Sequence, residues 1–306
     1  ALRGAAISLD GCLRHFTLES GCFPCAFVLW VGHGVDGFQE ADITGLTRSC
    51  TKHNYLVKNV NDLGRIIHEA FHIARSGRPG PVLIDIPKDV QFATGTYTEK
   101  SKSKIDHYNP QRRGDLDAIT ELVELIEKAE RPVLYTGGGV INSGNQASQL
   151  LRELVQETNF PITSTLMGLG SYPASGKNWL GMLGMHGTYE ANLSMHGCDL
   201  MINIGARFDD RITGVLDKFS PHSKKAHIDI DASSINKVIT VDVPIIGDVA
   251  CVLEDLLKVW KSRGNKTNSS KISQWWSQIH EWQARKCLSY KNSDTIIKPQ
   301  YALERL

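Results

Sequence analysis

Apolar residues in the first third of the chain recur at two spacings, one typical of helices and one typical of strands. Residues 61–75 place apolar side chains three and four positions apart behind an Asn-Asp start, which predicts an amphipathic helix. Residues 82–86 form a continuous apolar run that ends at Pro87, which predicts a buried strand. This part of the chain is therefore expected to have α/β character.

From about residue 115 the alternation becomes regular. Helices are expected near 115–130, 145–158, 188–197 and 248–263, and strands at 132–135, 161–165, 200–204, 226–230 and 243–247. Strands that alternate with helices of this length favour a parallel sheet covered on both faces. We therefore predict an α/β fold whose central part, 115–263, is a doubly wound parallel sheet.

Polar segments separate the regular parts of the chain. Residues 96–114 are lysine-rich and aperiodic, and we expect a linker between domains there. A second polar segment begins at residue 264, so 264–306 are expected to hold another linker and the start of a further domain. With 306 residues, the chain is long enough for roughly two domains.

Composition narrows the function mainly by exclusion. The net charge of +1 gives no electrostatic case for binding nucleic acid or an anionic membrane. No apolar run approaches the roughly 20 residues of a membrane-spanning helix. Seven scattered cysteines without a recognisable signal peptide favour reduced thiols in a cytoplasmic compartment. Cys22 and Cys25 form a lone CxxC with no partner pair, so we expect no redox or zinc role for them.

Charged residues and glycines cluster where the predicted strands end. Arg207, Asp209, Asp210 and Arg211 follow the strand at 200–204, and other strands end in TGGGV, STLMGLG and IDID. All of these lie on one edge if the sheet is parallel. Glycines there let backbone N–H groups approach phosphate oxygens, and carboxylates accept ribose hydroxyls. A solvated loop of ion pairs is the alternative, but the cluster as a whole predicts a nucleotide site.

Two further motifs are expected to carry no function of their own. GGGVINSG resembles a dinucleotide fingerprint, but Asn142 replaces its third glycine and no acidic residue follows about 20 positions on, which argues against a plain nicotinamide dehydrogenase. HEAFH at 68–72 matches the H-E-x-x-H of zinc proteases. Apolar Ile66, Ile67 and Phe71 make this an ordinary packing helix, and no third ligand follows, so we expect no zinc.

Six stretches from residue 36 onward carry a resemblance to a known family. They are DGFQEADITGLTRSCTKHNYLVKNV, SGRPGPVLIDIPKDVQ, STLMGLGSYP, MLGMHGTYEANL, GARFDDRITG and HIDID. Together they resemble the large catalytic subunit of acetolactate synthase (acetohydroxyacid synthase). This family condenses 2-ketoacids, pyruvate or 2-ketobutyrate, with thiamine diphosphate and Mg²⁺, and its central domain holds FAD without a net redox role. The resemblance makes 36–95 the C-terminal part of a pyrimidine-binding domain and 115–263 the central FAD-binding-type domain.

The resemblance also assigns site residues, many of them at the strand ends already selected for a nucleotide. It implies an active-site channel lined by Phe38, Gln39, Lys88, Asp210 and Arg211. For Lys88 the alternative is a solvated charge after a strand. It implies FAD contacts at Arg78, Gly137, Gly138, Gly139, Thr165, Leu166, Met167, Leu183, Gly184, Met185, His186, Gly205, Arg207, Asp209, Arg211, Asp229, Ile230, Asp248 and Val249.

Several features depart from the family pattern. Residues 1–35 do not resemble it, and a frameshift or a fused start would explain the abrupt change. We find no segment for the glutamate that hydrogen-bonds the thiamine aminopyrimidine. The G-D-G…N signature that ties Mg²⁺ to the diphosphate is also absent, so we assign no metal ligand. We therefore expect a large-subunit fragment, truncated at both ends, that makes no acetolactate by itself.

Two other interpretations stay open. One is a sister thiamine enzyme such as pyruvate oxidase, although the stretches FQE, TKHN and RFDDR argue against it. The other is a non-catalytic remnant that binds a nucleotide or packs against a partner. By resemblance, the complete enzyme is expected to be a homo-oligomer with a small regulatory subunit as partner.

Overall fold

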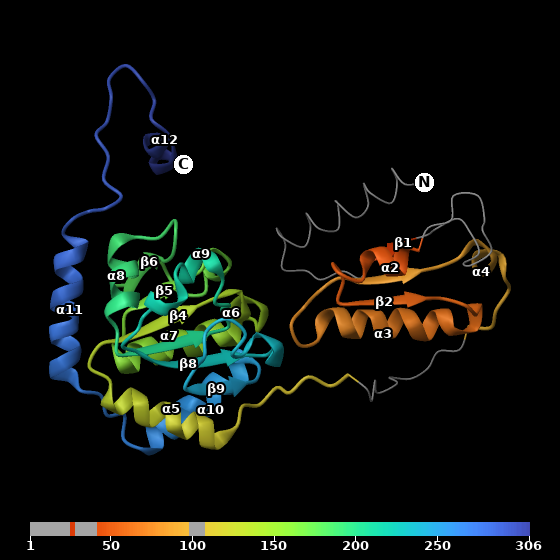
Figure 1. Cartoon of the computed structure of the whole chain (residues 1–306), viewed down its shortest axis with the longest axis horizontal. Coiled ribbons are helices and arrows are strands. Elements are labelled where there is room, and N and C mark those ends of the chain that lie inside the picture. Colours follow the sequence, from red (N-terminus) through yellow and green to blue (C-terminus); the bar gives the residue numbers. More distant parts are fainter. Residues whose placement is uncertain (1–24, 28–41, 98–107) are drawn as a thin grey trace. The chain divides into compact units, whose positions relative to one another are not determined.

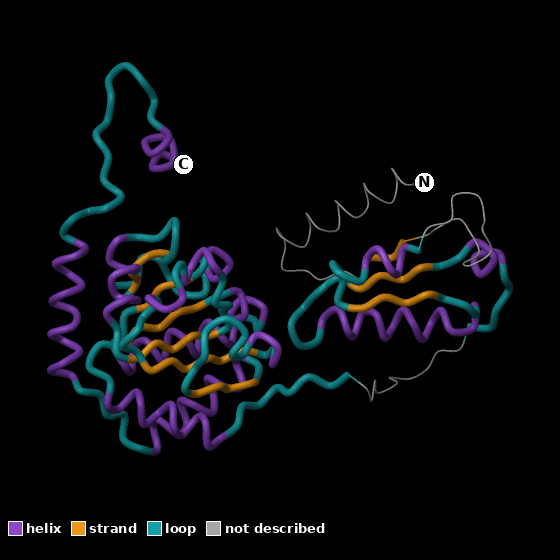
Figure 2. Tube along the Cα trace, viewed as in Figure 1, coloured by secondary structure: helices purple, strands orange, loops and turns teal. Residues whose placement is uncertain are grey.

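The structure is a computed structural model, and it describes residues 25–27, 42–97 and 108–306 (Figure 1). Helices and strands alternate along most of this length (Figure 2). The chain divides into two compact units, 1–112 and 113–306, each with its own hydrophobic core. The boundary between them falls inside the segment 96–114 that the sequence predicts as a linker.

The first unit is a small parallel sheet with helices packed on it. Its strands are β1 (Cys25–Phe27), β2 (His53–Leu56) and β3 (Val82–Asp85), in the order β1-β3-β2. Its helical segments are α2 (Ile43–Thr47), the 3₁₀ turn η1 (Val60–Asp62), α3 (Leu63–Arg75) and α4 (Lys88–Phe92). The predicted helix and strand are both confirmed, because η1 and α3 cover 61–75 and β3 covers most of 82–86.

Helix α3 packs on this sheet with one narrow face. The buried residues of the core are Val57, Ile66, Ala70, Ile73, Ala74, Val82, Ile84 and Val90. Ile67 and Phe71, which the sequence placed in the same stripe, are 36% and 43% exposed. That assignment is wrong because a helix turns about 100° per residue, which moves these two positions away from the buried face.

The second unit is built on a parallel sheet, as predicted, with six strands where the sequence pattern indicated five. The strands are β4 (Pro132–Thr136), β5 (Ile162–Ser164), β6 (Trp179–Met182), β7 (Leu200–Ile204), β8 (Lys224–Asp229) and β9 (Val243–Ile246). Their order is β6-β5-β4-β7-β8-β9, and every pair is parallel. Strands β4 and β7 are buried along their whole length, which explains their continuous apolar runs. The edge strand β6 escaped the sequence analysis.

Helices cover this sheet. They are α5 (Leu116–Lys128), α6 (Gly138–Asn142), α7 (Asn145–Thr158), α8 (Tyr189–Gly197), α9 (Asp210–Thr213) and α10 (Val249–Ser262), with 3₁₀ turns η2 (Leu166–Gly168), η3 (Leu216–Lys218) and η4 (Ala232–Ser234). Side chains of Asp115, Thr188 and Asp248 accept hydrogen bonds from the first turns of α5, α8 and α10, which fixes where these helices begin. Among the described residues, no helix is both long and apolar enough to cross a lipid bilayer.

The strand order reverses between β4 and β7. The chain runs outward from β4 through β5 to β6, then returns and runs outward the other way from β7 through β8 to β9. Parallel crossovers are right-handed, so this reversal places α7 and α8 on opposite faces, and the carboxyl ends of β4 and β7 form a topological switch point. Open α/β sheets bind their ligands at such a switch point.

A C-terminal helix, α11 (Ser269–Gln283), joins the core of the second unit, and α12 (Pro299–Arg305) follows it. Trp275 and Trp276 are 4% and 8% exposed. Their indole N–H groups donate to the carbonyl oxygens of Pro132, at 3.1 Å, and Asn159, at 2.8 Å. From the sequence, 264–306 were expected to hold a linker and the start of a further domain. The structure instead packs α11 against α8 and the sheet, because two large indoles need apolar cover.

Candidate functional site

The loops after β4 and β7 touch at the switch point. The backbone N–H of Gly137 donates to Ile204 O at 3.0 Å, and that of Gly139 donates to Gly205 O at 2.9 Å. A Cβ atom on Gly139 would lie 2.7 Å from Gly205 Cα, which is too close for any real side chain. Gly205 itself has a φ of +64°, in the region that favours glycine. The TGGG turn therefore serves first to bring two strand ends into backbone contact.

The loop after β5 lies beside the same turn. Thr165 N donates to Thr136 O at 2.9 Å, and a Cβ on Gly138 would lie 3.2 Å from Met167 Cβ. Leu166 and Met167 are 68% and 61% exposed. These two side chains give the edge of the sheet an apolar surface next to its glycines.

The loop after β6 joins the cluster through Arg211. Met185 N donates to Arg211 O at 2.9 Å. The Asn192 side chain holds Gly184 by accepting from its N–H at 2.8 Å and donating to its carbonyl at 3.0 Å. Met185 is 61% exposed and His186 is exposed as well. Leu183 is buried and supports the loop, whereas Met185 and His186 are available at the surface.

The charged residues after β7 present their side chains to solvent. The side chains of Arg207, Asp210 and Arg211 are 62%, 83% and 68% exposed. The nearest N···O distances between Arg207 and Asp209, and between Arg211 and Asp210, are both 3.9 Å. Pairs so long and exposed contribute little to stability. The loop is therefore not held by these ion pairs, and its guanidinium groups can bind an anion.

Asp229 ends β8 at the same edge of the sheet. Its carboxylate is largely buried; Oδ1 accepts from Asp231 N at 2.9 Å, and Oδ2 lies 3.6 Å from His227 Nε2. Ile230 follows it, half-buried. Gly205 N donates to Ile228 O at 2.8 Å, which joins this strand end to the loop after β7.

Asp248 caps α10, so its carboxylate already accepts a hydrogen bond from the first turn of that helix. Its Oδ1 accepts from Ala250 N at 3.2 Å and from Ser143 Oγ at 2.8 Å. Ser143 Oγ in turn accepts from Ala250 N at 3.0 Å. The adjoining Val249 is buried, so of this predicted pair the Asp248 carboxylate is the part open to a ligand. Ser143 is a site residue that the sequence analysis missed; its place shortly after the TGGG turn was the available signal.

Four predicted residues lie in the part of the chain before the second unit. Phe38 and Gln39 lie outside the described residues. Arg78 follows α3, Lys88 begins α4, and both are exposed residues of the first unit. Their roles in a shared active site stay predictions.

The HEAFH histidines lie on α3 without a metal-like arrangement. Glu69 is nearly buried, receives the Arg65 guanidinium at 2.9 Å and accepts from the Tyr55 hydroxyl at 3.3 Å. This environment raises the pKa of Tyr55 to about 12, first through burial and then through the Glu69 charge. Within the described ranges, no group of three His, Cys, Asp or Glu side chains could hold a metal ion. Cys22, of the lone CxxC, lies outside those ranges.

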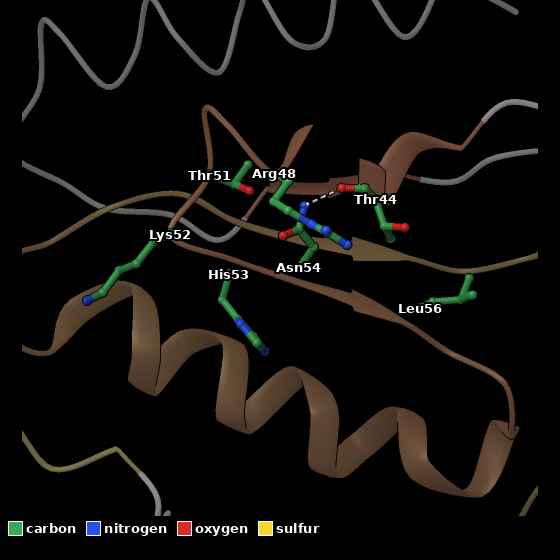
Figure 3. A pocket seen from close by; sticks show the side chains of 7 residues that line it. All are labelled: Thr44, Arg48, Thr51, Lys52, His53, Asn54 and Leu56. Carbon is green, nitrogen blue, oxygen red and sulfur yellow. Dashed lines mark hydrogen bonds between the residues drawn. The ribbon is translucent and has the colours of Figure 1, made fainter. Parts of the chain in front are cut away.

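A cavity of about 430 Å³ lies along the edge strand β2 of the first unit (Figure 3). It is lined by Thr44, Arg48, Thr51, Lys52, His53, Asn54 and Leu56. Asn54 donates to Thr44 O within it, and the Lys52 ammonium binds the carbonyls of Ile73 and Ser76 at the end of α3. No predicted site residue lines the cavity, and its lysine is hydrogen-bonded to backbone carbonyls. We therefore assign the cavity no function.

The cluster at the switch point has the chemistry of a dinucleotide site. Arg207 and Arg211 offer exposed cations for a diphosphate, Asp229 and Asp248 offer acceptors for ribose hydroxyls, and Met167 offers an apolar surface for a flat ring. Arg207 and Arg211 come from one loop, and Asp229, Asp248 and Met167 each come from a different strand end. The residues present therefore fit FAD.

Comparison with known proteins identifies close relatives. Residues 119–256 match the family model of the thiamine pyrophosphate enzyme central domain. The chain is 42% identical over 275 residues to the acetolactate synthase isozyme 3 large subunit of Escherichia coli K12, which covers 89% of this chain and 48% of the relative. It is 42% identical to the acetolactate synthase large subunit of Haemophilus influenzae, again over 89% of this chain and 47% of the relative.

A third relative gives the same result. The large subunit of Corynebacterium glutamicum acetolactate synthase is 43% identical over 89% of this chain and 43% of its own length. The chain thus spans about half the length of the curated relatives it matches. The chain is a homologue of the acetolactate synthase large subunits, and its residues 119–256 are related to the central domain of thiamine pyrophosphate enzymes.

Proposed function

We propose that the second unit binds FAD across the carboxyl ends of its strands. The observation that carries this proposal is the contact between the loops after β4 and β7, which places the start of the loop that bears the exposed Arg207 and Arg211 against the TGGG turn. Arg207 and Arg211 hold the diphosphate, and Asp229 and Asp248 accept ribose hydroxyls. Met167 and Met185 cover a ring face.

Charge supplies much of the affinity in this proposal. A hydrogen bond to an ionised group contributes about 1.5–3 kcal/mol, and these arginines fall at the low end because solvent screens them. The family resemblance implies Arg78 as a further contact of the diphosphate. The half-buried Thr165, after β5, and the exposed His186, after β6, donate further hydrogen bonds to the ligand.

At the level of the whole protein, we propose an acetolactate synthase large subunit that condenses pyruvate or 2-ketobutyrate. Thiamine diphosphate, bound with Mg²⁺, supplies the carbanion chemistry of that condensation. Phe38, Gln39, Lys88, Asp210 and Arg211 line the channel to it. A second copy of the chain and a small regulatory subunit are its partners. Cys50, Cys198, Cys251 and Cys287 are unpaired thiols, which supports a reducing, cytoplasm-like compartment.

The FAD proposal is tested by thermal shift with FAD and with NAD at equal concentrations. FAD should raise the melting temperature of the second unit more than NAD does. Arg207→Gln should reduce this stabilisation, because it removes a cation from the strand ends. Arg131→Gln is the matched control, since Arg131 is exposed at the opposite, amino end of β4. A larger stabilisation by NAD, or an equal loss in the control, would contradict the proposal.

A further inference from the structure

Two consecutive backbone carbonyl groups at the start of the loop that bears Arg207 and Arg211 accept hydrogen bonds from side chains of three strands. The Tyr135 hydroxyl, on β4, donates to Arg207 O at 2.9 Å. Asn203 Nδ2, on β7, donates to Ala206 O at 2.9 Å. His227 Nε2, on β8, binds the same Ala206 oxygen at 2.9 Å. The loop backbone is thus fixed at two carbonyls by side chains from three adjacent strands.

All three residues are buried, each at 0% exposure. Buried polar groups of this kind cost stability unless they are hydrogen-bonded, so their presence in apolar strands needs a reason. Asn203 also accepts from Ala206 N at 3.1 Å, which fixes the orientation of its amide. Burial raises the pKa of Tyr135 far above its ordinary range, so the phenol stays a neutral donor.

His227 connects the loop to Asp229. A carbonyl oxygen can only accept, so Nε2 of His227 carries the proton that it shares with Ala206 O. The same Nε2 lies 3.6 Å from the Asp229 carboxylate, and Nδ1 is buried without a partner among the described residues. The imidazole also packs edge-to-face on Phe208, at 5.2 Å between ring centres. Among the described residues, the hydrogen bond of this buried imidazole is therefore made by Nε2, to the loop carbonyl.

We infer that Tyr135, Asn203 and His227 are positioning residues, which hold the backbone at 206–207 so that Arg207 and Arg211 face the dinucleotide. The exposed ion pairs cannot hold the loop, and the only hydrogen bonds to these two carbonyls among the described residues come from the three buried side chains. Their effect on ligand affinity rests on the proposed FAD site. Their effect on the loop does not, since it follows from the free chain.

The test compares His227→Gln with His227→Asn in the full chain. In glutamine, as in histidine, the side-chain Nε2 is three bonds from Cβ, so the Gln variant can still donate to Ala206 O. The asparagine side chain is one bond shorter and cannot reach it. Trypsin cleavage after Arg207 and Arg211 reports the loop, and cleavage after the exposed Lys291 is the internal reference. Relative to Lys291, cleavage of the loop should rise roughly tenfold in His227→Asn, the factor set by one unsatisfied buried group, and stay near wild type in His227→Gln.

FAD titration, followed by quenching of flavin fluorescence, gives the second measurement. The dissociation constant should rise roughly tenfold in His227→Asn and recover in His227→Gln. Equal behaviour of the two variants in both measurements would overturn the positioning role, because packing alone would then explain His227. If wild type binds no FAD, the proposed function fails, and the trypsin comparison alone still decides the positioning role.

A gentler variant protects the test against misfolding. Tyr135→Phe removes only the hydroxyl that binds Arg207 O, and the ring keeps its packing. Cleavage after Arg207 should again rise relative to Lys291. An unchanged rate in this variant would remove Tyr135 from the set of positioning residues.

Discussion

The close approach of the loops after β4 and β7 is open to a direct stability test with Gly139→Ala. A Cβ at this position would lie 2.7 Å from Gly205 Cα and 2.9 Å from Gly205 O, both backbone atoms that no rotamer change can move. The two loops would have to separate, and the hydrogen bond from Gly139 N to Gly205 O, at 2.9 Å, would lengthen. The variant therefore tests the geometry on which the site depends.

The magnitude follows from two opposing contributions. Overpacking a close-packed interior costs about 1–3 kcal/mol, and a collision between backbones falls in the upper part of that range. Replacing a helical glycine by alanine returns about 0.5–1 kcal/mol. The net loss expected for Gly139→Ala is therefore about 1–2 kcal/mol.

Gly197→Ala is the matched control. Gly197 ends α8, and a Cβ there would meet only the Trp275 ring, at 3.5 Å, an ordinary contact. This variant should gain up to about 1 kcal/mol, so the two substitutions should have opposite signs. The assay is urea unfolding of the full chain followed by tryptophan fluorescence, because five of the six tryptophans lie in 113–306. Equal stabilities of Gly139→Ala and Gly197→Ala would refute the backbone contact.

Three further outcomes are expected. Trp275→Ala should lower the unfolding free energy of the second unit by about 3–5 kcal/mol in the same urea assay. Gln274→Ala, at an exposed position on the same helix, should lower it by less than about 0.5 kcal/mol. Similar losses in the two variants would contradict the packing of α11 on the core. The pKa of Tyr55 is raised from 10.0 to about 12, so its neutral form stabilises the first unit fully below pH 10 and less as the pH approaches 12. Tyr55→Phe should flatten this alkaline loss in unfolding followed by circular dichroism, and an unchanged slope would contradict it. Finally, this chain alone should form no acetoin from pyruvate with thiamine diphosphate, Mg²⁺ and FAD supplied; turnover above a no-protein control, abolished by Gln39→Ala, would contradict this expectation.

The sequence was sufficient to predict the elements whose environment is uniform. Strands β4 and β7 are buried on both faces, so their apolar runs are unbroken, and helices α5, α8 and α10 begin at side-chain caps. The shared edge of the strand ends followed from parallel pairing alone. The edge strand β6 was missed because its burial is mixed and its pairing with β5 contains an irregularity.

The contacts that build the site could not be predicted in the same way. Docking of α11 depends on which surface its tryptophans meet, and the spacing of apolar residues does not contain that information. The partnership of Ser143 with Asp248 joins residues far apart in the chain. Asn203 and His227 did leave a signal, since each is a polar residue inside an apolar strand, but the sequence does not say which carbonyl they bind.

The location of FAD on the second unit is the central claim, and hydrogen–deuterium exchange with and without FAD tests it most directly. With FAD, exchange should slow in the loops after β4, β5, β6 and β7, at 137–139, 165–167, 183–186 and 205–211, and at the end of β8. Exchange should not change at 129–131, on the opposite edge of the same sheet. Protection confined to that opposite edge or to the first unit, with the loop at 205–211 unchanged, would contradict it.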